Sequence, residues 1–258
     1  MKLYLKYLKL HLKSTMQYKT SFILSFISQF FVAFSFYFVV ISMFDKFNNI
    51  KGFTLYEVLL TTGIIYFGFS FNEFFARGID NFDNQIVKGT FDRILLRPRN
   101  IFFQAMVEEM DFVKISRILQ AIAIIVISLV NLNIQFNIFR IIAFVLMLLS
   151  SIAIFLSLNI LSASYCFITI QGLEVRHIFT DGGKYVAQYP INIYKKGFAL
   201  FFTVIIPYAF VNYYPLLYFT GKSNNILYCF SPLIVLIYLF ISFKVFNIGV
   251  KKYSSTGS

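Results

Sequence analysis

Long uncharged stretches, separated by short charged clusters, are the main pattern along this chain. Five stretches of more than 20 residues contain no Asp, Glu, Lys or Arg, and a sixth, 58–72, lies between Glu57 and Glu73. A helix rises about 1.5 Å per residue, so about 20 apolar residues cross a hydrocarbon core of about 30 Å. The five long stretches meet this length, and the sixth meets it if the two glutamates lie at the two membrane interfaces.

These stretches are continuously apolar and do not alternate between apolar and polar positions, which favours helices over the strands of a membrane barrel. We predict an all-α integral membrane protein with one transmembrane domain, 1–258, in which six transmembrane helices follow an amphipathic interfacial helix. Hydrophobic residues make up 59% of the chain, against about 45–50% in a typical soluble domain. The predicted spans are 21–44, 55–75, 115–132, 141–168, 198–219 and 226–244.

The distribution of Lys and Arg orients the predicted spans. With the N-terminus inside, the inner segments hold 19 of the 23 basic residues, and the outer segments hold Lys46, Lys51, Arg140 and Lys222. Because cytosolic loops carry the excess of Lys and Arg in membrane proteins, both termini are expected in the cytosol. The same asymmetry accounts for the net charge of +12, so we expect no nucleic-acid binding.

Residues 1–19 differ from the spans that follow. Lys2, Lys6, Lys9 and Lys13 recur at steps of three or four residues, which places them on one side of a helix. We predict a helix along the inner membrane surface with its lysines toward anionic headgroups of the lipid bilayer. The apolar stretch after it is too long for a signal-peptide core, so we expect the first span to remain as an anchor.

The segment 76–117 is the longest polar part of the chain and is predicted to be cytosolic. Apolar residues recur with an approximately helical period from 79 to 95, Gly89 interrupts this pattern, and Arg97-Pro98-Arg99 ends it. This predicts a short amphipathic helix, a turn, and a helix that enters the third span. The segment 171–196 is also polar and contains three glycines, so it is predicted as another cytosolic connection.

Prolines interrupt the last two predicted spans. A proline inside a helix frees a backbone carbonyl, and such breaks are tolerated at membrane depth only where protein or water satisfies the backbone. The outer end of the fifth span is therefore the best candidate for a broken or re-entrant element. Its proposed residues are Pro207, Asn212, Tyr213, Tyr214 and Pro215.

No catalytic or metal-binding pattern emerges from the reactive side chains. His11 and His177 lie near predicted membrane boundaries, and Cys166 and Cys229 lie inside apolar stretches. No charged residue occupies the centre of a predicted span, where proton and ion pathways place theirs. The chain is expected to hold no cofactor and not to be an enzyme, so energy for any transport would come from another polypeptide.

Four stretches resemble a known family. The run Lys88-Gly89-Thr90-Phe91-Asp92-Arg93-Ile94-Leu95-Leu96-Arg97-Pro98 resembles the G-x-h-D-x-h-L-h-R-P signature of ABC type-2 exporter permeases, in which h is a hydrophobic residue. It is most similar to the small six-span branch that includes proposed drug or viologen exporters. The other three stretches are 188–194, 206–215 and 253–258.

The resemblance implies the permease subunit of an ATP-driven exporter in a bacterial cell membrane, moving a hydrophobic or amphipathic substrate outward. It implies a second permease, identical or related, to form a dimer, and ATP-binding cassette ATPase subunits that bind ATP and Mg²⁺. In this family the loop after the second span carries a coupling helix that docks on the ATPase, here about 79–98. The residues expected at that contact are Gly89, Phe91, Asp92, Arg93, Leu95, Arg97 and Pro98, with Phe91 and Leu95 as its apolar anchors.

Two other functions stay open from the sequence. A membrane-embedded immunity or scaffold protein, which shields a cell from a toxin, would have the same spans without transport activity. A membrane-embedded enzyme acting on lipid would need interfacial acid–base or metal-binding residues, which are not evident. The content of 35 Phe and 17 Tyr suits either a drug-like substrate or plain lipid contact.

Overall fold

Helices make up 82% of the structure, a computed structural model that describes residues 2–47, 49–169 and 177–254. Five described helical segments are long and apolar enough to cross a membrane, and a bent pair makes a sixth if its two parts count as one span. The all-α membrane fold predicted from the sequence is confirmed. The five segments contain α2 (Lys19–Lys46), α3 (Leu55–Phe75), α8 (Ile115–Asn131), α9 (Ile138–Thr169) and α16 (Ile234–Lys252).

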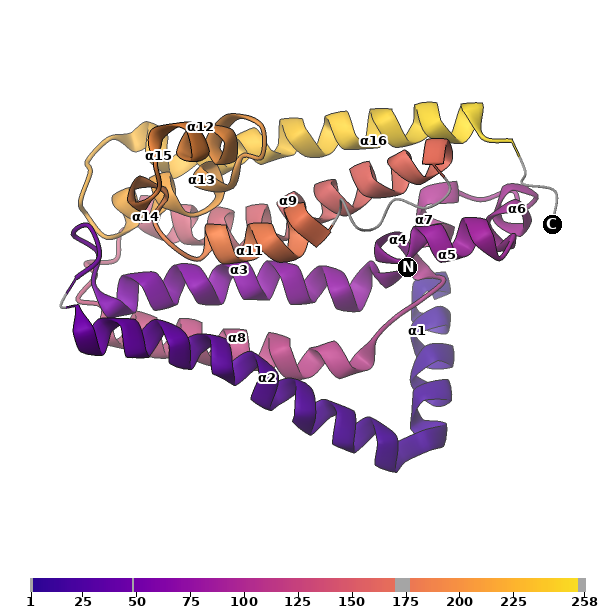
Figure 1. The fold of residues 1–258 in the computed structure, drawn as a ribbon, viewed down its shortest axis with the longest axis horizontal. Helices are drawn as coiled ribbons and strands as arrows, with labels where there is room; N and C mark the ends of the chain where they lie inside the picture. Colours follow the sequence, from indigo (N-terminus) through magenta and orange to yellow (C-terminus); the bar gives the residue numbers. More distant parts are fainter. Residues whose placement is uncertain (1, 48, 170–176, 255–258) are drawn as a thin grey trace.

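These helices form an elongated bundle around α3, most of whose residues are buried against α8 and α9 (Figure 1). The 76–117 segment lies at one end, which we call the inner end, and the loop before α3 lies at the opposite, outer end. Both ends of the described chain lie at the inner end, because Tyr4 packs on Phe103 and Tyr253 packs on Phe91. This arrangement agrees with an even number of crossings.

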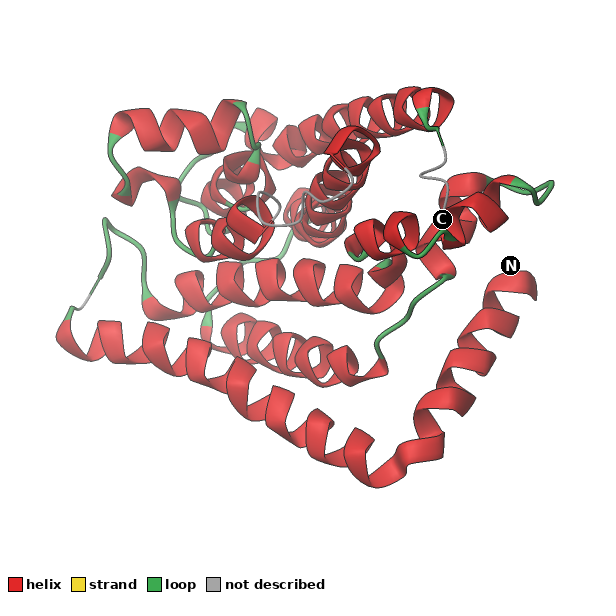
Figure 2. Ribbon diagram, turned by 45° about the vertical axis from the view of Figure 1, so that its right-hand side comes forward, coloured by secondary structure: helices red, strands yellow, loops and turns green. Residues whose placement is uncertain are grey.

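The N-terminal helix α1 (Lys2–Thr15) lies across the inner end of the bundle, and a short turn, η1 (Met16–Tyr18), joins it to α2 (Figure 2). Tyr4, Tyr7 and Leu8 pack against a buried cluster of the inner segment, while Leu5 and Leu10 stay exposed. The helix predicted for residues 1–19 is therefore present. Its contact with the membrane surface stays a prediction.

The inner segment between α3 and α8 is built from short helices, so the coupling helix expected over about 79–98 is divided into several pieces, one division falling at Gly89, where the sequence pattern is interrupted. Gly89 adopts a left-handed backbone with φ of 63°, which a side chain would strain, and this residue separates α5 from α6. The helices are α4 (Arg77–Asp80), α5 (Phe82–Val87), α6 (Thr90–Leu95), α7 (Ile101–Val107) and η2 (Phe112–Lys114).

The middle of the segment 171–196, residues 183–191, packs into the bundle, so the prediction of a cytosolic connection is wrong for these residues. The hydroxyl of Thr61 on α3 donates to the carbonyl oxygen of Gln188 at 2.7 Å, and the hydroxyl of Tyr189 lies 3.4 Å from the sulfur of Met43, near the outer end of α2. Residues 170–176 lie outside the described residues. The elements here are η3 (Ile178–Gly182), α11 (Gly183–Ala187) and η4 (Ile191–Ile193).

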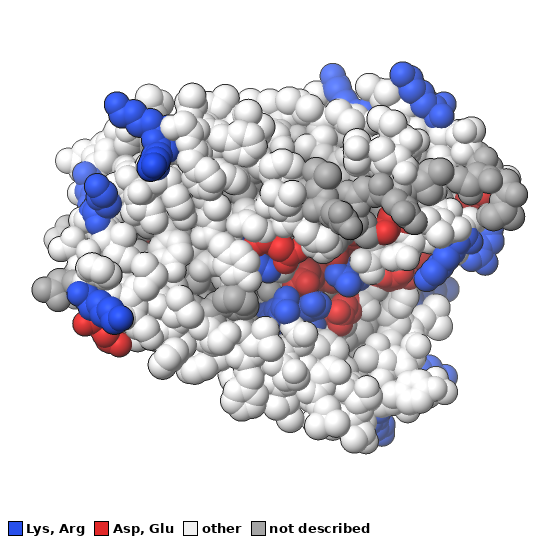
Figure 3. All heavy atoms as spheres, in the orientation of Figure 1, with Lys and Arg blue, Asp and Glu red and all other residues white. Residues whose placement is uncertain are grey.

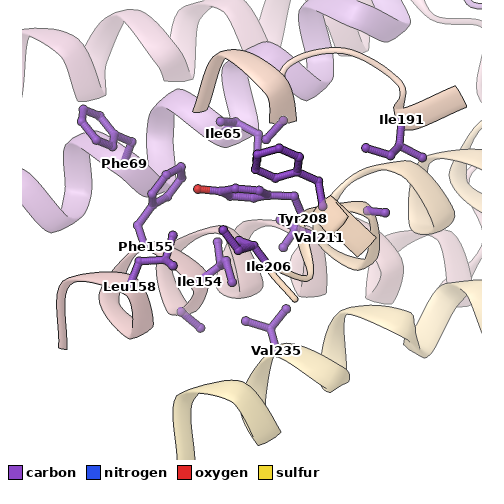
Figure 4. Close-up of a cluster of buried hydrophobic side chains, with 14 residues drawn as sticks. Ile65, Phe69, Ile154, Phe155, Leu158, Ile191, Ile206, Tyr208, Val211 and Val235 are labelled. Atoms are coloured by element: carbon purple, nitrogen blue, oxygen red, sulfur yellow. The ribbon is translucent and has the colours of Figure 1, made fainter. Parts of the chain in front are cut away.

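The predicted fifth span, 198–219, is broken. Its two parts, Lys196–Val204 and Tyr208–Phe219, are bent by 69°. The break surrounds Tyr208, whose ring lies in an apolar cluster with side chains from α3 and α9 (Figure 4), and whose hydroxyl donates to the carbonyl of Phe179 at 2.9 Å. The remaining helices are α12 (Lys196–Val204), α13 (Tyr208–Val211), α14 (Tyr213–Phe219), α15 (Ile226–Phe230) and η5 (Ser231–Leu233).

Candidate functional site

The first candidate site is a helical hairpin at the inner end, formed by α5 and α6 and called here the inner hairpin (residues 82–97). Its buried side is apolar: Phe82, Phe91 and Ile94 are at most 2% exposed. They share one core with residues at the inner ends of α9 and α16. The hairpin is therefore held against two long helices that extend toward the outer end.

Phe91 lies inside this core rather than on the surface. Its ring centroid is 4.9 Å from that of Phe82, 5.5 Å from that of Phe167 on α9 and 5.2 Å from that of Tyr253 after α16. The side chain expected from the sequence to anchor a partner is thus 0% exposed within this chain. This placement corrects the expected role, because a buried ring supports the hairpin from behind instead of contacting a separate subunit.

The outward side of the inner hairpin combines basic and apolar side chains. Leu96 is 85% exposed, and Leu95 is partly exposed beside it. Lys88, Arg93, Arg97 and Pro98 are also exposed, while Gly89 and Asp92 are intermediate. Except for Phe91, the expected contact residues therefore reach the surface, and Leu96 is an exposed apolar residue that the sequence analysis did not select.

Asp92 faces the chain's own C-terminal region. Burial, together with the neighbouring Asp92 carboxylate, raises the pKa of Tyr253 to about 12. Tyr253 is therefore a neutral hydroxyl at physiological pH. The contact ties the hairpin to the residues that follow α16.

The second candidate site is a cavity of about 320 Å³ in the inner half of the bundle, called here the charged cavity. α3, α4, α8 and the η3–α11 segment each contribute charged side chains to its wall. Figure 3 shows these acidic and basic groups gathered in one area of an otherwise largely uncharged face. The charged wall residues are Arg77, Lys114, Arg117, Lys184, Glu73, Asp80 and Asp181.

Glu73, near the inner end of α3, organises one side of the charged cavity. Its two carboxylate oxygens each lie 2.8 Å from a cation, one from Lys114 and the other from Arg117. Its exposed fraction is only 8%. The Glu73 contacts thus join α3 to the start of α8, and Arg77 pairs with Asp80 within α4 on the same wall.

The opposite wall carries Lys184, which is 6% exposed. Its ammonium group lies 2.8 Å from Asp181 and 3.9 Å above the ring of Phe69 on α3. His177 also lies 2.8 Å from Asp181. The sequence analysis missed this buried lysine because it interpreted the segment as a solvated loop. The one signal in the sequence was the neighbouring Gly182-Gly183 pair, since glycine allows the backbone to pack closely against other residues.

Gly183 explains how this segment enters the bundle. A Cβ atom at this position would lie 2.6 Å from the hydroxyl of Tyr208, so only glycine fits the observed packing. Asn212, at the break between α13 and α14, donates its side-chain amide to the carbonyl of Ala187. The backbone of α11 is thus satisfied by a residue of the broken element, as buried irregular backbone requires.

The other residues predicted for the broken element lie on both sides of its breaks. Pro207 precedes α13, and the main bend falls at 205–207 rather than at 212–215. Tyr213 packs on Phe53 at the outer end, with 6.0 Å between ring centroids. Tyr214 contacts Tyr228, and Pro215 is buried in the first half of α14.

An ion pair between a buried glutamate and an exposed lysine lies at the outer end of the bundle. Glu57, at the start of α3, lies 2.6 Å from Lys222, whose ammonium also donates to the carbonyl of Gly52. The pair joins two outer loops. Among the described residues, no group of three or more His, Cys, Asp or Glu side chains is arranged to hold a metal ion.

Comparison with known proteins identified one family. Residues 18–257 match the model of a family described as ABC-2 family transporter protein. No curated protein and no solved structure matched the chain. The match covers both candidate sites.

Proposed function

Since the chain belongs to the ABC-2 family of transporter proteins, we propose that it is the transmembrane permease subunit of an ATP-driven exporter. ATP hydrolysis takes place on separate ATP-binding cassette subunits, which bind ATP and Mg²⁺. The chain works with a second permease, identical or related. It moves a hydrophobic or amphipathic substrate outward across the cell membrane of a bacterium.

The inner hairpin carries this proposal. An ATPase on one side of a bilayer drives transport only through a physical element whose position both sites influence. The hairpin has an exposed side for the ATPase, with Leu96 between basic residues, and a buried side that packs on α9 and α16. A displacement at the exposed side therefore moves the inner ends of two long helices.

The aromatic ring contacts make this connection stiff. Phe82 contacts both Phe167 on α9 and Phe246 on α16, with centroid distances of 5.2 and 5.7 Å. Closely packed cores shift between discrete arrangements instead of deforming continuously. We therefore assign Phe91 to transmission within this chain and Leu95, Leu96 and Arg97 to contact with the ATPase.

The orientation follows from the same assignment. The hairpin meets the ATPase in the cytosol, so the inner end of the bundle is cytosolic, and both termini are cytosolic with it. The excess of Lys and Arg in the inner segments supports this orientation. The outer end, with its Glu57–Lys222 pair, then faces the exterior.

Co-purification tests the proposal. The full chain, expressed together with candidate ATP-binding cassette subunits from its source organism, is expected to retain one of them through affinity purification. Leu96→Glu is expected to lose that subunit while still inserting in the membrane. Asn224→Glu, an exposed change in an outer loop, is the matched control and is expected to retain it. Retention by both variants would contradict the assigned docking surface.

A further inference from the structure

We propose that the charged cavity binds the anionic head of an amphipathic molecule, with a phosphate or carboxylate group as the recognised chemistry. The inference rests on the proposed permease function, since it names the substrate class that such a permease would accept from the inner side. Three features of the cavity support the inference: the charges on its wall, the burial of these charges, and the exposed apolar residues at its edge.

Among the described residues of the wall, positive charges outnumber negative ones. Four cations, Arg77, Lys114, Arg117 and Lys184, face three carboxylates, Glu73, Asp80 and Asp181. Asp111 does not line the cavity, but it forms a longer ion pair with Lys114, at 4.0 Å. Glu73 alone is shared between Lys114 and Arg117, whose side chains are 12% and 16% exposed. Excess positive charge at such burial is stabilised when an anion joins the cluster.

Arg117 has unused capacity to bind that anion. Among the described residues, its guanidinium donates through one nitrogen to one oxygen of Glu73. A guanidinium has five N–H donors and pairs bidentately with phosphate or carboxylate groups. A ligand oxygen in the cavity can therefore be bound without breaking the contact with Glu73.

The remaining wall suits an apolar body. Tyr66 and Phe69 lie toward the outer end of α3 from Glu73, line the cavity and are buried. Val32 on α2 and Tyr185 on α11 line it as well, and they are 45% and 41% exposed. The charged wall is thus continuous with an exposed apolar surface, along which a hydrocarbon tail fits while the head stays among the cations.

The depth of the cavity matches such a molecule. Glu73 lies two residues before the inner end of α3, and the ends of a membrane-spanning helix lie at the level of the lipid headgroups. An amphipathic anion in the inner leaflet carries its head at this level. Entry from that leaflet therefore needs no transfer of the charge through hydrocarbon.

Fluorescence of a single introduced tryptophan tests the inference. The chain contains no Trp, so Tyr185→Trp in the full chain, purified in dodecyl maltoside, reports from the cavity. Dodecyl phosphate is expected to shift its emission at a concentration about tenfold lower than dodecyltrimethylammonium, since charge-assisted bonds form only with the anion. Equal or tighter binding of the cation would overturn the inference. Binding of inorganic phosphate as tight as that of dodecyl phosphate would overturn the amphipathic part.

Variants locate the binding. In the reporter chain, Arg117→Gln is expected to weaken dodecyl phosphate binding about tenfold, and Arg117→Lys is expected to weaken it less. Lys251→Gln, at an exposed position at the end of α16, is expected to change nothing. Unchanged binding of dodecyl phosphate to Arg117→Gln contradicts the inference. If that variant does not fold, the comparison of anion with cation in the reporter chain still tests the inference. If the chain binds the anion selectively but retains no ATPase in the co-purification experiment, the site is upheld and the permease assignment is refuted.

Discussion

Phe91 and Tyr253 pack edge to face, with 5.2 Å between their ring centroids. The contact joins the inner hairpin to the residue that follows α16, although the two lie far apart in the sequence. Both rings also contact Phe167 on α9. The hairpin is therefore part of the helix bundle and not a free loop.

This packing predicts a stability effect at Phe91. Phe91→Ala removes a fully buried ring and is expected to cost about 3–5 kcal/mol of unfolding free energy. Leu96→Ala removes an exposed side chain of the same hairpin and is expected to cost less than about 0.5 kcal/mol. Thermal unfolding of the two variants in detergent compares them. Equal losses of stability would show that Phe91 is not a core residue.

The Glu73 cluster predicts a second stability effect. Glu73→Gln leaves Lys114 and Arg117 without the carboxylate that they share, and removing one partner from a buried pair costs about 3–5 kcal/mol. The double variant Glu73→Gln/Arg117→Gln also removes one of the cations and is expected to recover part of that loss. Melting temperatures of the wild-type chain and both variants measure the effect. A double variant that melts below Glu73→Gln would contradict this pairing.

The buried position of the segment after α9 is tested by cross-linking. The hydroxyl of Thr61 donates to the backbone carbonyl of Gln188 at 2.7 Å, so the two residues are neighbours and the pair Thr61→Cys/Gln188→Cys is expected to form a disulfide under mild oxidation. The pair Thr61→Cys/Lys88→Cys is the control and is expected to form none, because Lys88 lies on the inner hairpin. The disulfide is identified on a gel as a change in mobility that disappears when the sample is reduced. If the segment were a cytosolic connection, neither pair would cross-link.

The orientation predicts a labelling pattern in whole cells. Lys51→Cys and Lys222→Cys, in the outer loops, are expected to react with a membrane-impermeant thiol reagent, and Lys88→Cys is expected not to react. The native Cys166 and Cys229 are buried, so their background labelling should be low. Labelling at position 88, with none at positions 51 and 222, would show that the chain has the opposite orientation in the membrane.

Sequence patterns predicted the long helices because the length of an uncharged stretch directly reflects the thickness of a bilayer. They also predicted the turn at Gly89, because the helical spacing of apolar residues is interrupted at this glycine and both features can be read from neighbouring residues. The burial of Phe91 was not predictable, because an amphipathic period shows which side of a helix is apolar but not what covers it. Residues of 183–189 looked like a loop because Thr61 and Asn212, which satisfy their backbone, are distant in sequence.

Coupled ATP hydrolysis is the measurement that tests the central assignment most directly. The chain and its ATPase partner, reconstituted together in liposomes, are expected to hydrolyse ATP faster when substrate is present. Leu96→Glu buries an unpaired charge at the contact with the ATPase, so it should abolish this stimulation or the association itself. Asn224→Glu should leave both intact. Normal association and stimulation in Leu96→Glu, or ATP hydrolysis by this chain without any partner, would contradict the account.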